Sequence, residues 1–265
     1  MSRGNVRSRE FRLWLLACGA IGLIFGLWPA LDLRLAGLFY DSTAGIGPTG
    51  FVHADQPLIW AVYKGVPRLG WLAALVGLLA WAWPTLRRIG GRAGPGAAAS
   101  ASAPEAAARL DGSKAASRTA GTSPWRRRLI LLLVTVMFGL VLAVNGVLKE
   151  GWGRPRPEQV SEFGGAKVFQ PWWQPSRQCA SNCSFVTGHG ATGTVLLGIG
   201  LLSPVVRRRR WLVAGWAAGL AIGLVRMIQG GHFASDVLFA CLVIWGVGIA
   251  IRRVALISRL RRWRR

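Results

Sequence analysis

Residues 225–251 read VRMIQGGHFASDVLFACLVIWGVGIAI, in which a short polar stretch leads into an almost unbroken apolar run. The run 233–251 is close to the ~20 residues that a helix needs to cross a bilayer. His232 and Asp236 are four residues apart, so they share one face if this helix begins near His232. We therefore expect a transmembrane helix whose first turn carries an imidazole held by a carboxylate, with the other ring nitrogen left as a free lone pair.

Five more apolar blocks of similar length accompany this one. Such blocks are too long for an ordinary soluble core, so the 265-residue chain is expected to be an integral membrane protein. The predicted fold is an all-α, polytopic bundle of about six transmembrane helices. The expected spans are 12–31, 66–86, 129–148, 185–203, 211–229 and 233–251.

A segment of different composition divides the chain. Residues 89–124 are dominated by Ala, Gly, Ser, Pro and Arg, and large apolar side chains are almost absent. Such a composition is typical of disorder, so we expect a cytoplasmic linker. It would separate a two-span N-terminal unit (1–88) from a four-span catalytic unit (125–251), which is followed by a basic cytoplasmic tail (252–265).

The net charge of +23 would suggest nucleic acid as a partner if the protein were soluble. The Lys and Arg residues instead gather in the loops and tails expected on one side of the membrane. If the N-terminus is cytoplasmic, most Lys and Arg fall on the inner side, as the positive-inside rule expects. This pattern disfavours a nucleic-acid groove and indicates a multi-pass membrane protein. We expect it in a bacterial inner membrane, with the site described below facing the periplasm or exterior.

Three cations fall at the outward ends of the expected spans. Lys149 ends the third span, Arg226 lies near the end of the fifth, and Arg156 follows in a Gly- and Pro-rich stretch that can fold back toward Lys149. A cation beside hydrocarbon is costly unless it meets water or an anion. Snorkelling to lipid headgroups is the alternative for each cation alone, but together with the histidines they favour a site for a phosphoryl group.

Thr187-Gly188-His189 precedes another apolar block and is expected to open the fourth helix. Free backbone N–H groups at such a helix start favour an anion, and the Thr187 hydroxyl would add a donor. A metal held by His189, His232 and Asp236 is the alternative. The surrounding cations would repel a divalent ion, so we expect no metal and no other cofactor.

Cys179 and Cys183 lie in the long outward loop before this helix. Outside the cytosol we expect them to pair and to constrain the segment that leads into Thr187. A zinc site is the alternative, and it lacks two further ligands nearby.

The spacing of the three clusters resembles the type 2 phosphatidic acid phosphatase superfamily, over roughly residues 129–251. The motifs occur in order as Lys149-x6-Arg156-Pro157, Thr187-Gly188-His189 and Arg226-x5-His232-x3-Asp236. Two residues depart from the family pattern, because Thr187 and Val225 stand where serine is usual. The loop stretches Phe163-Gly164-Gly165 and Asn182 to Phe185 also look like a bacterial subgroup that includes lipid A 1-phosphatase-like enzymes.

The resemblance implies a helical core shared with haloperoxidases and a metal-independent phosphatase that works through a phosphohistidine. His232 would be the nucleophile, His189 the proton donor and Asp236 the residue that orients His232. The phosphoryl oxygens would be held by Lys149, Arg156, Thr187, Gly188 and Arg226.

The implied substrate is the phosphomonoester or diphosphate end of a membrane lipid, such as lipid A, undecaprenyl diphosphate or a phospholipid phosphate. Two other functions stay open. A lipid phosphotransferase would use the same site but pass the phosphoryl group to another lipid. A non-catalytic protein that binds anionic lipid would need the cations but not the two histidines.

Overall fold

The structure, a computed structural model, describes residues 3–90, 124–202 and 205–263. This described part is helical, with one isolated β-bridge between Val160 and Lys167. Most of the expected linker 89–124 lies outside the described residues. The elements are α1 (Arg3–Leu27), α2 (Ala30–Gly37), η1 (Gly47–Gly50), α3 (Pro57–Gly90), α5 (Pro124–Thr135), η3 (Val136–Leu148), α6 (Lys149–Gly151), η4 (Pro157–Gln159), η5 (Ser161–Phe163), α7 (Gly188–Thr194), α8 (Leu196–Leu202), α9 (Val205–Ile228) and α10 (Ala234–Trp263).

Five helical stretches in the described part are long and apolar enough to cross a membrane. They are Arg9–Leu27, Pro57–Leu79, Leu129–Gly151, Arg207–Ile228 and Ala234–Ala255. The all-α membrane bundle is therefore confirmed. The third of these stretches is α5, η3 and α6 in succession, and η3 is a π-helix, with hydrogen bonds reaching five residues back.

The fourth expected span, 185–203, differs from the prediction. It consists of two short helices, α7 and α8, that separate at Val195 and together cover only 188–202. Its small residues serve close packing, because a Cβ on Gly193 would lie 2.8 Å from the Ala218 carbonyl oxygen of α9. In the described residues, the apolar run thus forms a helix that is broken at Val195 and packed against α9, and not one continuous helix of transmembrane length.

The structure divides into two compact units, residues 1–70 with 131–265 and residues 71–130. The smaller unit contains the later part of α3 and the start of α5. Every site residue discussed below lies in the larger unit. The boundaries expected at residues 88 and 125 stay predictions.

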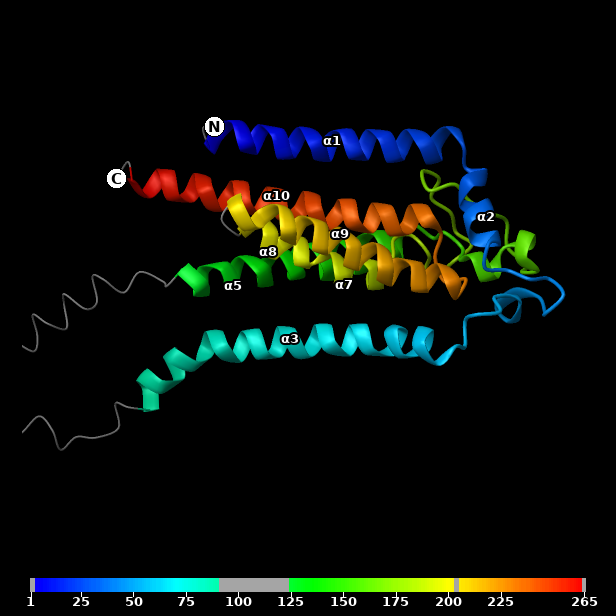
Figure 1. Cartoon of the computed structure of the whole chain (residues 1–265), viewed down its shortest axis with the longest axis horizontal. Coiled ribbons are helices and arrows are strands. Elements are labelled where there is room, and N and C mark those ends of the chain that lie inside the picture. Colours follow the sequence, from blue (N-terminus) through cyan, green and yellow to red (C-terminus); the bar gives the residue numbers. More distant parts are fainter. Residues whose placement is uncertain (1–2, 91–123, 203–204, 264–265) are drawn as a thin grey trace, which may run out of the picture. The chain divides into compact units, whose positions relative to one another are not determined.

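Within the larger unit, α1 runs along α10 (Figure 1). Trp14 of α1 donates from its Nε1 to the Leu242 carbonyl oxygen at 2.9 Å. Near the start of α1, Glu10 forms ion pairs with Arg208 at 2.7 Å and with Arg252. Through Glu10, these ion pairs join α1 to the first part of α9 and to the later part of α10. Helix α10 continues to Trp263, through most of the segment expected as a tail.

The start of α10 lies at the other end of the helix from these ion pairs and is covered by loops. After Pro29 the chain enters α2 (Figure 1), which packs against residues from the loops that precede α3 and follow α6. The buried apolar cluster there consists of Ala36, Phe51, Val160, Phe163 and Phe233. The long outward loop is therefore anchored to the N-terminal segment directly beside His232.

Candidate active site

The three sequence clusters converge in the structure. Lys149 begins α6, and Arg226 lies in the last turn of α9. These two residues and Arg156 are close enough to repel one another electrostatically. Burial lowers the pKa of His189, and all three cations also lower it electrostatically. The expected gathering of cations around the histidines is therefore present.

His232 is buried between α9 and α10, with 1% of its surface exposed. Its Nδ1 lies 2.6 Å from the Ser184 carbonyl oxygen. A carbonyl can only accept, so Nδ1 carries the proton and Nε2 keeps its lone pair. Burial lowers the pKa of His232 to about 3, so the ring is neutral at physiological pH.

The expected direct bond between Asp236 and His232 is absent. Asp236 Oδ2 lies 3.8 Å from His232 Nδ1, beyond hydrogen-bond distance. The same oxygen instead accepts from the Ser184 hydroxyl at 2.5 Å and from the Phe233 backbone N–H at 2.8 Å. Asp236 thus holds Ser184, and the backbone carbonyl of Ser184 holds His232. The four-residue spacing placed the carboxylate on the correct face but could not reveal this intermediary.

A buried arginine outside the expected phosphate set contacts the same carboxylate. Arg154 has no exposed surface, and its Nη1 donates to Asp236 Oδ1 at 2.6 Å. Its Nη2 donates to Asp32 Oδ2 at 2.8 Å. The Arg154 guanidinium also lies over the Phe233 ring, with Cζ 4.4 Å from the centroid. Arg154 therefore connects α2 to the start of α10.

His189 lies near the start of α7 and is half buried. Its Nε2 is 3.2 Å from the Tyr63 carbonyl oxygen, and its ring stacks on the Tyr63 ring with centroids 5.1 Å apart. The carbonyl again fixes the tautomer, here by accepting from Nε2–H. Nδ1 is then the nitrogen left to exchange a proton with a bound molecule.

Arg226 is oriented from two sides. Its Nη1 donates to Gln229 Oε1 at 2.5 Å, and its Cζ lies 4.6 Å from the Tyr63 ring centroid. Its Nε is buried without a hydrogen-bond partner among the described residues. A Cβ on Gly231 would collide with Nη2 of Arg226, so this close approach requires glycine at position 231.

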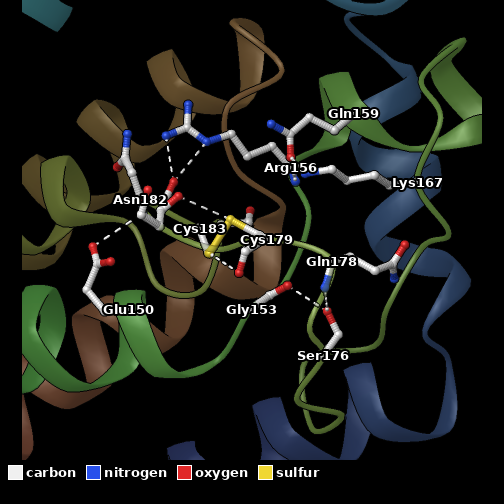
Figure 2. Close-up of a disulfide and its surroundings, with 12 residues drawn as sticks. Glu150, Gly153, Arg156, Gln159, Lys167, Ser176, Gln178, Cys179, Asn182 and Cys183 are labelled. Carbon is white, nitrogen blue, oxygen red and sulfur yellow. Dashed lines mark hydrogen bonds between the residues drawn. A yellow bond between two sulfur atoms is a disulfide. The ribbon is translucent and has the colours of Figure 1, made fainter.

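Arg156 is held by the loop that carries the two cysteines, as Figure 2 shows. Its Nη2 donates to the Asn182 carbonyl oxygen at 2.9 Å, and Glu158 approaches its Nη1 at 3.7 Å. Cys179 and Cys183 form a disulfide, which closes the short loop containing Asn182. The pair expected to constrain the approach to Thr187 therefore also flanks the carbonyl that holds Arg156.

Thr187 and Gly188 occupy the expected helix start. Thr187 is the N-cap of α7, and its hydroxyl accepts from the Gly190 backbone N–H at 3.4 Å. Thr187 is fully buried. A Cβ on Gly188 would lie 2.9 Å from the Asn145 side-chain oxygen, so the chain passes very close to η3 here.

Within the residues that the structure describes, no group of three or more His, Cys, Asp or Glu side chains gathers as a metal site. The described side chains instead suit an anion. Guanidinium and ammonium groups lie near the neutral imidazole of His232 and the imidazole of His189. The arrangement can bind a phosphoryl group and offer it a nitrogen lone pair.

Sequence reasoning assigned no role in the site to four contributors: Asp32, Tyr63, Arg154 and Ser184. Arg154 had a signal, since it stands beside the first motif in a segment bordered by apolar spans. Asp32 follows the first span with nothing in its spacing to connect it to Asp236. Tyr63 and Ser184 each bind a histidine through the backbone carbonyl, which every residue has, and their side-chain contacts with His189, Arg226 and Asp236 join segments that are far apart in sequence, so neither residue carried a local signal.

Comparison with known proteins identifies the family of the segment that carries the three motifs. Residues 129–260 match the PAP2 superfamily. The chain is 41% identical over 122 residues to the lipid A 4′-phosphatase of Francisella tularensis subsp. novicida, covering 46% of this chain and 55% of the relative. It is also 41% identical over 118 residues to the lipid A 4′-phosphatase of Rhizobium leguminosarum, covering 44% of this chain and 50% of that relative.

A lipid A 1-phosphatase of Rhizobium etli is 33% identical over 108 residues, which is 40% of this chain and 41% of the relative. The chain thus spans about half the length, or less, of these curated relatives. No solved structure matches it. Through residues 129–260, which carry all three motifs, the chain belongs to the PAP2 superfamily.

Proposed function

We propose that this protein is a membrane phosphatase that hydrolyses a phosphomonoester of lipid A through a phosphohistidine on His232. The observation that carries the proposal is the state of His232. Its Nδ1–H is fixed by the Ser184 carbonyl oxygen, its ring is neutral, and it lies in the field of Arg226 and Arg156. A binding protein needs such cations but has no use for an oriented nitrogen lone pair.

In the first step, the Nε2 lone pair of His232 attacks phosphorus, and the bond from phosphorus to the sugar oxygen breaks. Binding of the anionic phosphate group favours the imidazolium form of His189, which then carries a proton on Nδ1 as well as on Nε2 and donates the Nδ1 proton to that leaving oxygen. Lys149, Arg156 and Arg226 stabilise the charge on the phosphoryl oxygens as it redistributes in the transition state. Asp236 acts through Ser184 by keeping the Ser184 carbonyl in place.

In the second step, water attacks the phosphorus of the phosphohistidine. His189, now neutral, accepts a proton from that water as the new P–O bond forms. The P–N bond breaks, its electron pair returns to Nε2, and inorganic phosphate leaves. If another lipid hydroxyl replaced water, the same step would be phosphotransfer, so dependence on an acceptor separates the two activities.

The names of the relatives support lipid A as the substrate. The chain shares a larger fraction of identical residues with the two 4′-phosphatases than with the 1-phosphatase. We therefore infer removal of the 4′-phosphate, with the 1-phosphate as the second candidate. Both are monoesters on a sugar, so the same chemistry would serve either one.

We also propose the inner membrane as the location, with the site facing the periplasm. The positive-inside pattern supports this orientation, because Arg207 to Arg210 lie at the opposite end of α9 from Arg226. The eighteen helical rises from Arg208 to Arg226 span about 27 Å. This distance would place the two groups of cations near opposite faces of one bilayer.

The test is phosphate release by the detergent-purified full chain in the presence of EDTA. Lipid A, undecaprenyl diphosphate and phosphatidic acid are supplied separately, and mass spectrometry identifies the position lost from lipid A. We expect metal-independent loss of the 4′-phosphate that His232→Ala abolishes. His53→Ala is the matched control, because His53 is exposed and remote in sequence from the motifs.

Release of phosphate only when a second lipid is added would replace hydrolysis by phosphotransfer. Loss of the 1-phosphate alone would change the position but keep the chemistry. Full activity in His232→Ala would contradict the proposed mechanism.

A further inference from the structure

Two acidic side chains and one arginine are buried together next to His232. Asp32 and Asp236 have 1% and 0% of their surface exposed, and Arg154 has 0%. Buried charges are costly unless they are paired and hydrogen-bonded. One cation cannot neutralise two carboxylates, so the group carries a net negative charge if both acids are ionised.

The geometry shows how Arg154 is shared. Its guanidinium donates to Asp236 from Nη1 at 2.6 Å and to Asp32 from Nη2 at 2.8 Å. Its Nε donates to the Gln170 carbonyl oxygen at 2.8 Å, which leaves little freedom to rotate. Each carboxylate therefore binds a different nitrogen of one fixed fork.

Ser235, the residue directly before Asp236, links Asp32 to Arg154 a second time. Its hydroxyl donates to Asp32 Oδ2 at 2.5 Å and accepts from Arg154 Nη1 at 2.9 Å. Its backbone N–H donates to Asp32 Oδ1 at 2.9 Å. Asp32 thus fixes the residue directly before Asp236, and this positions the start of α10.

The charge of Asp32 has a consequence for the reaction. Without it, Arg154 would pair with Asp236 alone and neutralise it. When both acids are ionised, the group keeps a net negative charge, and its oxygen nearest to His232 Nδ1, Asp236 Oδ2, lies 3.8 Å away. When Nε2 attacks phosphorus, the imidazole ring becomes cationic, and a nearby negative charge stabilises that state.

We infer that Asp32 is a positioning residue for phosphoryl transfer. Asp32 shares the positive charge of Arg154 with Asp236, so Asp236 is not fully neutralised and keeps negative charge near His232. The inference rests on the proposed function and extends it to a segment outside residues 129–260. Asp32 touches neither His232 nor the phosphate-binding cations among the contacts described, so it acts through Arg154 and Ser235.

A purely structural role is the competing explanation, in which Asp32 only fastens α2 to α10. The two roles differ in what they affect. A fastening contact changes the melting temperature and the yield of folded protein. A charge contact changes the rate of phosphohistidine formation in the folded protein but not the affinity for substrate.

The experiment compares the full chain with Asp32→Asn and Asp32→Glu in detergent, with lipid A as substrate. Asp41→Asn is the matched control, because Asp41 is an exposed carboxylate in a turn that bonds to Thr43. We measure Tm, kcat, KM and the single-turnover rate of phosphoenzyme formation. His232→Ala is included as the reference for loss of chemistry.

The expected result is a drop in kcat and in the phosphoenzyme rate of about tenfold or more in Asp32→Asn, the ~1.4 kcal/mol that corresponds to one decade. KM should stay within about twofold, since the phosphate-binding cations are untouched, and Asp32→Glu should recover most of the rate. A lower Tm with unchanged kcat in Asp32→Asn would overturn the inference. Full activity in His232→Ala would instead overturn the proposed function.

If Asp32→Asn does not fold, Ser235→Ala carries the test. It removes the hydroxyl that links Asp32 to Arg154 and keeps all three charges. The inference expects a smaller loss, of a few-fold in kcat with KM unchanged. Wild-type kcat in Ser235→Ala would then contradict it.

Discussion

Residues 129–260 and residues 3–70 contribute to the same site in different ways. The first segment supplies the groups expected to meet the phosphoryl group, and their spacing follows the PAP2 motifs. The second supplies Tyr63, which contacts His189 and Arg226 directly, and Asp32, which acts through Arg154 and Ser235. The reactive part of such a site can thus be recognised from spacing, whereas the part that orients it has no fixed spacing relative to the motifs.

The largest expected effect after loss of His232 concerns a cation of the motif segment. Arg226→Ala should lower kcat by about 10²–10³-fold, as removal of one group that stabilises transition-state charge does elsewhere. Arg209→Ala is the control, since Arg209 is exposed near the opposite end of α9. Steady-state kinetics on both variants checks the prediction, and equal losses in the two would contradict a specific role of Arg226.

The next effect tests how tightly that cation is positioned. In Gly231→Ala, the new Cβ must displace the Arg226 guanidinium, which we expect to lower kcat/KM by about 10- to 100-fold. Gly65→Ala is the control, because a Cβ there meets nothing within 4 Å. If Gly231→Ala kept wild-type kcat/KM, the close approach of Gly231 to Arg226 would not matter for function.

Tyr63 tests the contribution of the N-terminal segment directly. Tyr63→Leu removes the ring that stacks on His189 and lies over Arg226, and two such contacts of about 1 kcal/mol each predict a loss of ten- to thirtyfold in kcat/KM. Tyr63→Phe keeps the ring and should retain most activity. A loss in Tyr63→Phe as large as in Tyr63→Leu would move the role from the ring to the hydroxyl.

The disulfide should have the smallest effect. Replacing both Cys179 and Cys183 by Ser frees the loop that holds Arg156 through the Asn182 carbonyl, so we expect KM to rise by a few-fold with kcat nearly unchanged. The closed loop is short, so Tm should change little. Cys18→Ser serves as the control, and an unchanged KM in the double variant would show that Arg156 is held without the disulfide.

The fold and the motif residues were largely predictable. Apolar run length identified five of the helices, and the cations and histidines converge as expected. The break between α7 and α8 was not predictable from hydropathy, because small apolar residues favour both a membrane span and a tightly packed short helix. Only the packing of Gly193 against α9 distinguishes the two.

The partners of Asp236 show a second limit. Its spacing from His232 predicted a shared helix face, and this is compatible with the 3.8 Å separation. Which hydrogen bond forms depends on Ser184 and Arg154, which reach the carboxylate from a loop. Such contacts depend on chain folding over long sequence distances, and local periodicity does not encode them.

The most direct test of the account is to trap the phosphoenzyme. Purified protein is mixed with lipid A carrying ³²P at the 4′-phosphate, quenched in alkali and digested, and the labelled peptide is identified. The account predicts an alkali-stable, acid-labile label on His232 that is absent in His232→Ala and present in His53→Ala. Phosphate release under single-turnover conditions with no label on His232, or a label that persists in His232→Ala, would contradict it.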